Sequence, residues 1–137
     1  MDKTIILVDP DDDDYYLLEQ VVRQTDDSLN INHFTTADAV ISHLQNNTDP
    51  VFMIICEINL PGMSGVELRA QLDNDPTLRA RSIPFLFMSD PVPAEITNKA
   101  YDMTVQGVFQ KPSNMPDYTR LMRTIVDYWT HCLHPNR

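Results

Sequence analysis

Glu57 ends the apolar run of residues 51–57 and is the first candidate for a chemical role. Such a run, preceded by Asp49-Pro50 and followed by Pro61-Gly62, is typical of a strand buried on both faces. Strands of this kind belong to parallel sheets covered by helices. Open sheets of that sort collect their chemistry at the carboxyl ends of the strands, so we expect Glu57 to face a site.

Three other apolar runs also deliver a polar group: Asp9 after residues 4–8, Ser89 at the end of residues 84–89, and Lys111 after residues 105–110. In a doubly wound sheet, these groups and Glu57 converge on one edge. The sequence therefore predicts a site that combines two carboxylates, a hydroxyl and an ammonium group.

The elements that position this site follow from hydrophobic periodicity. Strands are predicted at residues 4–8, 30–34, 51–57, 84–89 and 105–110, alternating with five amphipathic helices. Thr35 or Thr36, Ser64, and Ser113 or Asn114 are the predicted caps of three of these helices. A strict strand–helix repeat predicts an α/β fold, a doubly wound five-stranded parallel sheet with helices on both faces.

Other residues that could do chemistry are better explained by structure. The four acids Asp11 to Asp14 suit the positive end of a helix, and capping or solubility explains them. His33 has no second ligand at metal spacing. Cys56 and Cys132 lack the spacing of a disulfide framework or a metal site.

The chain carries 137 residues and a net charge of −10. The charge disfavours nucleic acid and anionic membrane surfaces as partners. No apolar run reaches the length of a membrane-spanning helix, and the N-terminus lacks a signal-peptide pattern. We therefore expect one domain in a cytoplasmic protein, without a membrane or nucleic-acid partner.

Four segments together resemble the receiver domain of two-component response regulators: ILVDPDDDDYYLL, CEINLPGMSGVEL, FLFMSD and VFQKPS. The resemblance covers residues 1–137 as a single receiver domain and leaves no room for an output domain. It implies a flavodoxin-like fold with strand order 2-1-3-4-5 and a role in phosphorelay signal transduction. It also implies a sensor histidine kinase or another signalling protein as partner, and Mg²⁺ as the family's cofactor.

The resemblance assigns family roles to five positions. Glu57 occupies the position of the phosphoacceptor aspartate, and Asp9 that of the first of two metal-binding acids. Ser89 corresponds to the hydroxyl residue and Lys111 to the lysine, which precedes a frequently cis proline in this family. Asn59 would offer its backbone carbonyl to the metal. The metal site would therefore consist of Asp9, Glu57 and Asn59 at most.

Four positions depart from the family pattern. The acceptor is Glu57 rather than aspartate, and Pro10 stands in place of the second acid. Val108 occupies a position where Tyr or Phe is frequent, with Phe109 one place later, and Ser113 replaces a common Phe after Lys-Pro.

The first two departures affect the same chemical step. Pro10 has no side-chain oxygen for Mg²⁺, which requires near-ideal octahedral geometry. Glu57 is longer than aspartate by one C–C bond, ~1.5 Å, and a misplacement of ~1 Å can cost on the order of 10²-fold in rate. We therefore expect a degenerate phosphorylation site with no bound cofactor. Two explanations of Glu57 remain open: a carboxylate that contacts Lys111 and imitates the phosphorylated state, or neutral drift.

Three functions are compatible with the sequence. The leading one is a non-enzymatic protein-interaction module. The alternative is a working Mg²⁺-dependent receiver with unusual ligands, in which Asp11 or a water replaces the missing acid. The third is a flavodoxin-like enzyme, which the aspartates after the first strand disfavour because they would repel a flavin phosphate. By the resemblance, partner contacts or a homodimer would use the fourth helix, fifth strand and fifth helix (residues 94–104 and 115–129), with these candidates: Lys99, Tyr101, Tyr118, Arg120, Arg123 and Tyr128.

Overall fold

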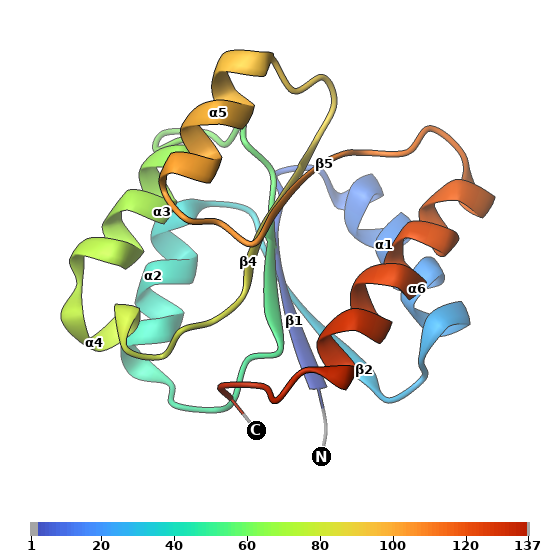
Figure 1. The fold of residues 1–137 in the computed structure, drawn as a ribbon, viewed down its shortest axis with the longest axis horizontal. Helices are drawn as coiled ribbons and strands as arrows, with labels where there is room; N and C mark the ends of the chain where they lie inside the picture. Colours follow the sequence, from blue (N-terminus) through green and yellow to red (C-terminus); the bar gives the residue numbers. More distant parts are fainter. Residues whose placement is uncertain (1–2, 137) are drawn as a thin grey trace.

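The computed structural model describes residues 3–136 and contains one five-stranded sheet, shown in Figure 1. The strands are β1 (Lys3–Val8), β2 (Leu29–Phe34), β3 (Met53–Cys56), β4 (Phe85–Ser89) and β5 (Gly107–Gln110). All neighbouring pairs are parallel, and the order is β2-β1-β3-β4-β5. The predicted fold class and strand order are confirmed.

β3 is shorter than the predicted strand 51–57, although its neighbours on either side keep the ladder bonds. The Phe52 N–H donates to the Thr4 carbonyl at 2.7 Å, and the Glu57 N–H donates to the Val8 carbonyl at 2.8 Å. The apolar run was therefore correctly interpreted as extended chain beside β1, with Glu57 at its end.

Helices cover both faces of the sheet (Figure 1): α1 (Asp12–Thr25) and α6 (Met115–His131) on one, and α2 (Ala37–Asn46), α3 (Gly65–Asn74), the short α4 (Pro76–Arg79) and α5 (Ala94–Asp102) on the other. None of the helices between residues 3 and 136 is long and apolar enough to cross a membrane.

The short helix α4 corrects the prediction of five helices, because the sequence analysis expected only one element between β3 and β4. The Asp75 side chain accepts the N–H groups of Thr77 and Leu78, and Pro76 occupies the first turn. An acidic cap followed by proline favours the start of a helix, so one additional turn forms after α3 ends.

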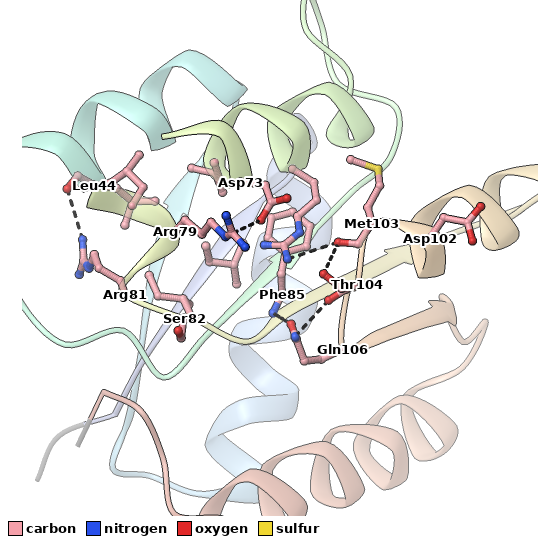
Figure 2. Close-up of a pocket in the computed structure, with 15 residues that line it drawn as sticks. Leu44, Asp73, Arg79, Arg81, Ser82, Phe85, Asp102, Met103, Thr104 and Gln106 are labelled. Carbon is pink, nitrogen blue, oxygen red and sulfur yellow. Dashed lines mark hydrogen bonds and ion pairs between the residues drawn. The ribbon is translucent and has the colours of Figure 1, made fainter. Parts of the chain in front are cut away.

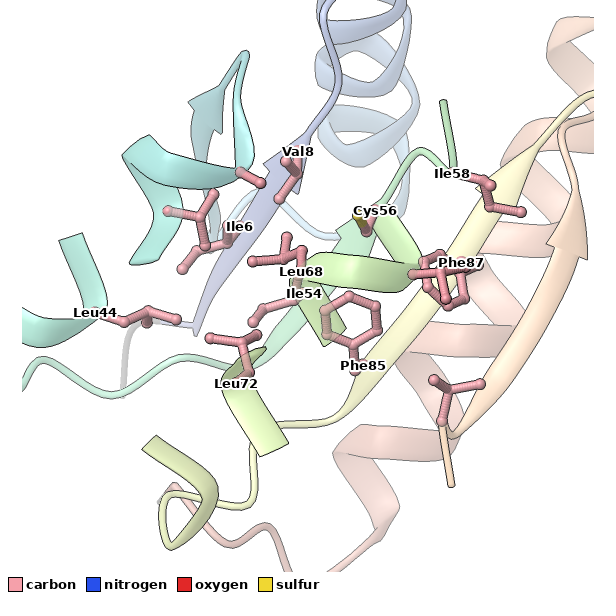
Figure 3. Close-up of a cluster of buried hydrophobic side chains, with 14 of the residues drawn as sticks. Ile6, Val8, Leu44, Ile54, Cys56, Ile58, Leu68, Leu72, Phe85 and Phe87 are labelled. Atoms are coloured by element: carbon pink, nitrogen blue, oxygen red, sulfur yellow. The ribbon is translucent and has the colours of Figure 1, made fainter. Parts of the chain in front are cut away.

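Alternating strand residues form two separate hydrophobic cores. Figure 3 shows the first core, in which Ile6, Val8, Phe85 and Phe87 pack under α2 and α3. The intervening strand residues, such as Ile5 and Leu7, contribute to the second core under α1 and α6. Burial on both faces explains why the strands are continuous apolar runs.

The predicted caps hold the loops that surround the strand ends. Thr36, Ser64 and Asn114 each accept a backbone N–H from the first turn of α2, α3 and α6. Gly65 lets α3 begin close to β3, because a Cβ atom there would lie 2.5 Å from the Glu57 carbonyl oxygen. The backbone at Glu57 is thus fixed by the start of α3.

Candidate functional site

The four predicted strand ends lie along one edge of the sheet. Val8 pairs with Cys56 in the ladder, so Asp9 and Glu57 leave neighbouring strands at the same level. Ser89 ends β4, and its carbonyl accepts the Lys111 N–H at 2.8 Å. The sheet thus delivers these residues to one edge, as the βα repeat predicted.

Lys111 is held by two carboxylates at this edge. Its Nζ lies 2.8 Å from Asp14 Oδ2 and 3.2 Å from Asp9 Oδ2, and its side chain is only 16% exposed. Burial of the ammonium group lowers the pKa of Lys111, but the Asp14 hydrogen bond and the charges of Asp9, Asp14 and Glu57 outweigh it. The pKa therefore lies above its usual value, and Lys111 is a cation at neutral pH.

Asp9 is a buried carboxylate, 3% exposed, with both oxygens engaged. Oδ1 accepts the Asp11 N–H at 2.9 Å, while Oδ2 accepts from Lys111. Burial raises the pKa of Asp9 above its ordinary value, although the hydrogen bond from Asp11 and the charge of Lys111 act in the opposite direction. Both carboxylate oxygens of Asp9 are therefore occupied by groups of the chain itself.

Asp14 is the site residue that sequence reasoning missed, because all four acids from Asp11 to Asp14 were assigned to capping or solubility. Asp11 is the cap, accepting the Asp13 N–H at 2.8 Å. Asp14 instead turns toward the strand ends and contacts Lys111. A signal was present, because Asp14 precedes buried Leu18 and Val21 at the i, i+4, i+7 spacing of the helix face that packs on the sheet.

Glu57 does not form the direct contact with Lys111 that one of the two hypotheses required. Its Oε2 accepts the N–H of the next residue, Ile58, at 3.0 Å. Across residues 3–136, the ion pairs of Lys111 are with Asp9 and Asp14. The extra methylene of glutamate lets its carboxylate fold back onto the adjacent backbone, which leaves Lys111 to the acids of β1 and α1.

Ser89 places a buried hydroxyl at this edge of the sheet. The residue is fully buried, and its Oγ has no hydrogen-bond partner among the described residues. Buried hydroxyls normally have a partner, so this group remains available at the strand end.

The donor set does not fit a Mg²⁺ ion. Pro10 is exposed and offers no side-chain oxygen, while both oxygens of Asp9 are engaged. Asp11, the substitute ligand of the alternative hypothesis, caps α1. Within residues 3–136, no three His, Cys, Asp or Glu side chains gather as ligands would. Mg²⁺ prefers several free oxygens in octahedral geometry, which this edge does not supply.

Two further expectations have separate outcomes. The family frequently has a cis peptide bond between its lysine and the following proline. In this protein the cis peptide bond found within residues 3–136 joins Asp90 and Pro91 instead. His33 has the expected structural role, since its Nε2–H donates to the Asp9 carbonyl at 2.8 Å and its ring stacks on Tyr15.

The sheet order, the acid at the end of β3 and the lysine after β5 define a receiver-type α/β domain. The profile of the response regulator receiver domain matches residues 5–123, which is most of the chain. The chain therefore belongs to the response regulator receiver domain family, a signalling module of two-component systems.

Solved structures of response regulators share this fold. The phosphorylated cyanobacterial phytochrome response regulator RcpA is 21% identical, with a TM-score of 0.84 and 96% of each chain covered. The Mn²⁺-bound form of response regulator Rcp1 is also 21% identical, with a TM-score of 0.81 over 96% of each chain. A receiver domain from Rhodospirillum rubrum is 18% identical, with a TM-score of 0.82 over 97% of each chain. No curated protein matches the sequence.

The raised pKa of Asp9 predicts how stability changes with pH. A carboxyl group whose folded-state pKa is raised stabilises the protein below its unfolded pKa, and that contribution is lost as pH rises through the folded pKa. Asp9→Asn lacks this loss. Its free energy of unfolding should therefore rise relative to the parent between about pH 4 and neutral pH, as measured by urea unfolding at a series of pH values.

Asp26→Asn is the matched control, because hydrogen bonds from Ser28 lower the pKa of Asp26. Its contribution is present above the unfolded pKa and is lost as pH falls through the folded pKa. The difference between Asp26→Asn and the parent should therefore stay flat above about pH 4. A decline of the Asp9→Asn stability relative to the parent over the same range would contradict the assignment for Asp9.

The assignment of Asp14 to the site rather than to capping predicts unequal effects of two neighbouring substitutions. Asp14→Asn removes a charge-assisted hydrogen bond from a half-buried lysine and should lower the free energy of unfolding by about 1.5 kcal/mol. Asp13→Asn changes the same charge one residue away on an exposed position, and should stay within about 0.5 kcal/mol. Equal losses in urea unfolding would assign both acids to the helix terminus alone.

Proposed function

We propose that this receiver domain acts as a protein-interaction module in phosphorelay signalling, with a degenerate phosphorylation site. The observation that carries the proposal is the closed charge cluster of Lys111 with Asp9 and Asp14. Phosphoryl transfer depends on positioning and on cations that neutralise the transferred group. Here two carboxylates of the chain already neutralise the lysine that would have to serve that purpose.

The acceptor position supports the same conclusion. The carboxylate of Glu57 reaches ~1.5 Å farther than that of aspartate, and its Oε2 is bonded to the Ile58 N–H. The position of Pro10 supplies no metal ligand. Positioning and charge neutralisation are therefore both weakened at the same step, which favours a module that works without phosphorylation and without a resident Mg²⁺.

The same geometry ranks the other functions. A working Mg²⁺-dependent receiver would need Asp11 as a ligand, but its carboxylate caps α1 and its side chain points to solvent. A flavin enzyme would need donors for a phosphate after β1, where this chain places aspartates instead. Permanent imitation of the phosphorylated state through Glu57 lacks the Lys111 contact it requires. We therefore favour a cytoplasmic, non-enzymatic signalling domain whose partner is a sensor histidine kinase or another signalling protein.

The proposed interaction surface is the face formed by α5, β5 and α6. Tyr101 and Tyr128 are exposed there by 51% and 63%, and Arg120 is exposed as well. Arg123, another of the predicted contacts, instead lies against the end of α1, where it donates to the Gln24 carbonyl at 3.4 Å. Exposed tyrosines and arginines are typical of protein interfaces. The prediction that Tyr118 is an exposed contact is wrong, because Tyr118 lies in the second core and is only 3% exposed. This burial raises the pKa of Tyr118 to about 12.

The phosphorylation proposal predicts that repairing the site restores its chemistry. Pro10→Asp with Glu57→Asp supplies a second metal-binding acid and an acceptor of the right length. Adding Asp14→Asn releases Lys111. The triple variant should bind Mg²⁺ and accept a phosphoryl group from acetyl phosphate, detected by intact mass, while each single variant should do much less because these groups act as a unit.

The control for this experiment is Asp13→Asn in place of Asp14→Asn, which removes the same charge without releasing Lys111. The proposal expects less labelling of the variant that carries Asp13→Asn than of the variant that carries Asp14→Asn. Labelling of the parent protein as fast as the triple variant would overturn the degenerate-site proposal and favour the Mg²⁺-dependent receiver.

The surface proposal predicts that Tyr128 carries self-association through the α5–β5–α6 face. Tyr128→Ser should raise the dissociation constant of the dimer by about tenfold, as measured by analytical ultracentrifugation, because tyrosines often contribute strongly to interfaces. Tyr16→Ser is the matched control, because Tyr16 on α1 is 61% exposed and Tyr128 is 63% exposed. Crosslinks concentrated on α1 and α2, or a chain that remains monomeric at millimolar concentration, would overturn the homodimer on this face.

A further inference from the structure

A cavity of about 430 Å³ lies at the amino end of β4 and β5, on the edge of the sheet opposite Asp9 and Lys111. Figure 2 shows it enclosed by α3, α4 and the chain that leaves α5. Its volume falls in the range of small-molecule sites. None of the family positions assigned above lies in this cavity.

Cations gather around the cavity although the chain is strongly acidic. Three of the ten Lys and Arg residues line it, namely Arg69, Arg79 and Arg81, against two acids, Asp73 and Asp102. The lining therefore has a formal charge of 3 − 2 = +1, in a chain whose net charge is −10. An anion is the ligand class that this local excess favours.

The three arginines differ in how fully they are used by the fold. Arg81 is fully engaged, because its guanidinium donates to the carbonyls of Leu44, Asn47 and Asp49. It ties the end of α2 and the loop that follows to the cavity wall. Arg81 is therefore a structural member of the lining.

Arg69 is a half-buried cation with donors to spare. Its guanidinium lies 5.5 Å from the Phe85 ring, and its one hydrogen bond within residues 3–136 is a long one, 3.5 Å, from Nη2 to the Met103 carbonyl. Its Nε–H is buried without a partner among the described residues. Burial also lowers the pKa of Arg69. A bound anion would satisfy this donor and compensate the buried charge.

Arg79 is the accessible cation at the cavity mouth. Its side chain is 72% exposed, and its Nε lies 3.8 Å from Asp73, a distance that leaves most of its donors free. Asp73 is the acid next to both arginines, and Leu72, Leu78 and Ile83 add an apolar part to the cavity wall. The cavity thus offers a fork of cationic donors beside a hydrophobic surface.

Backbone strain is concentrated at the same place. Ser82 and Thr104 are the two non-glycine residues with positive φ within residues 3–136, at 52° and 60°, and both line the cavity. A left-handed conformation is costly for a β-branched residue such as threonine. Such residues cluster at ligand sites, where the surrounding structure maintains them.

We propose that this cavity binds a small molecule that carries a phosphate or carboxylate group on an apolar body. The anionic group lies between Arg69 and Arg79, and the apolar body lies against Leu72, Leu78 and Ile83. The cavity includes none of the residues of the degenerate phosphorylation site, and it adjoins the proposed interaction surface only at the end of α5.

The test is an NMR titration of backbone amides with naphthyl phosphate, naphthoate and neutral naphthol. Both anions should shift amides of residues 69–83 and 102–106, and naphthol should bind about tenfold more weakly for lack of the charge-assisted hydrogen bonds. The tighter of the two anions identifies the head group. Equal binding of naphthol, shifts centred on Asp9 and Lys111, or no shifts at millimolar concentration would overturn the proposal.

Three substitutions locate the anion. Arg69→Met keeps the apolar stem and should weaken naphthyl phosphate about tenfold, while the exposed Arg79→Gln should weaken it a few fold. Arg120→Gln is the matched control, because Arg120 is also exposed and pairs with an acid of its own helix, Asp117. It should leave the affinity unchanged. If Arg69→Met fails to fold, as judged by circular dichroism, unchanged affinity of Arg79→Gln still overturns the proposal.

Discussion

The ammonium group of Lys111 is the cation on which the carboxyl edge of this sheet depends. Three segments that are distant in the sequence meet at it, since Asp9 follows β1, Asp14 lies in the first turn of α1 and Lys111 follows β5. A half-buried cation without counter-charges would be costly, and buried Asp9 and partly exposed Asp14 would repel one another without a cation. Each of the three groups has a partner of opposite charge within the cluster.

The same constraint explains why the other members of the edge are left outside the cluster. Glu57 satisfies its carboxylate on the Ile58 N–H, and the buried hydroxyl of Ser89 remains without a partner. In a phosphorylated receiver, a metal and a phosphoryl group would connect such residues to the lysine. Here Asp14 contacts the lysine instead, and Glu57 acts on Lys111 only through its charge, without an ion pair.

Periodicity and strand-end chemistry predicted the parallel sheet and the edge at which Asp9, Glu57, Ser89 and Lys111 lie, because a parallel sheet imposes these positions whatever the side chains do. The order of the strands came from the resemblance to receiver domains. The pairing of charges could not be predicted in the same way. Asp14 was one of four consecutive acids with equal helix-terminus preference, and in the sequence only its i, i+4, i+7 spacing to Leu18 and Val21 distinguishes it. Likewise, Tyr118 carries a polar hydroxyl and was predicted to be exposed, but its side chain packs in the second core.

The central claim is that Lys111 is neutralised within the chain and not by a metal or a phosphoryl group. The most direct measurement is the NMR signal of the Lys111 ammonium group, followed with and without Mg²⁺. The account predicts a protonated ammonium group, protected from exchange by Asp9 and Asp14, whose signal does not change when millimolar Mg²⁺ is added. A signal that shifts at micromolar Mg²⁺, as the ion displaces Lys111 from Asp9, would contradict it.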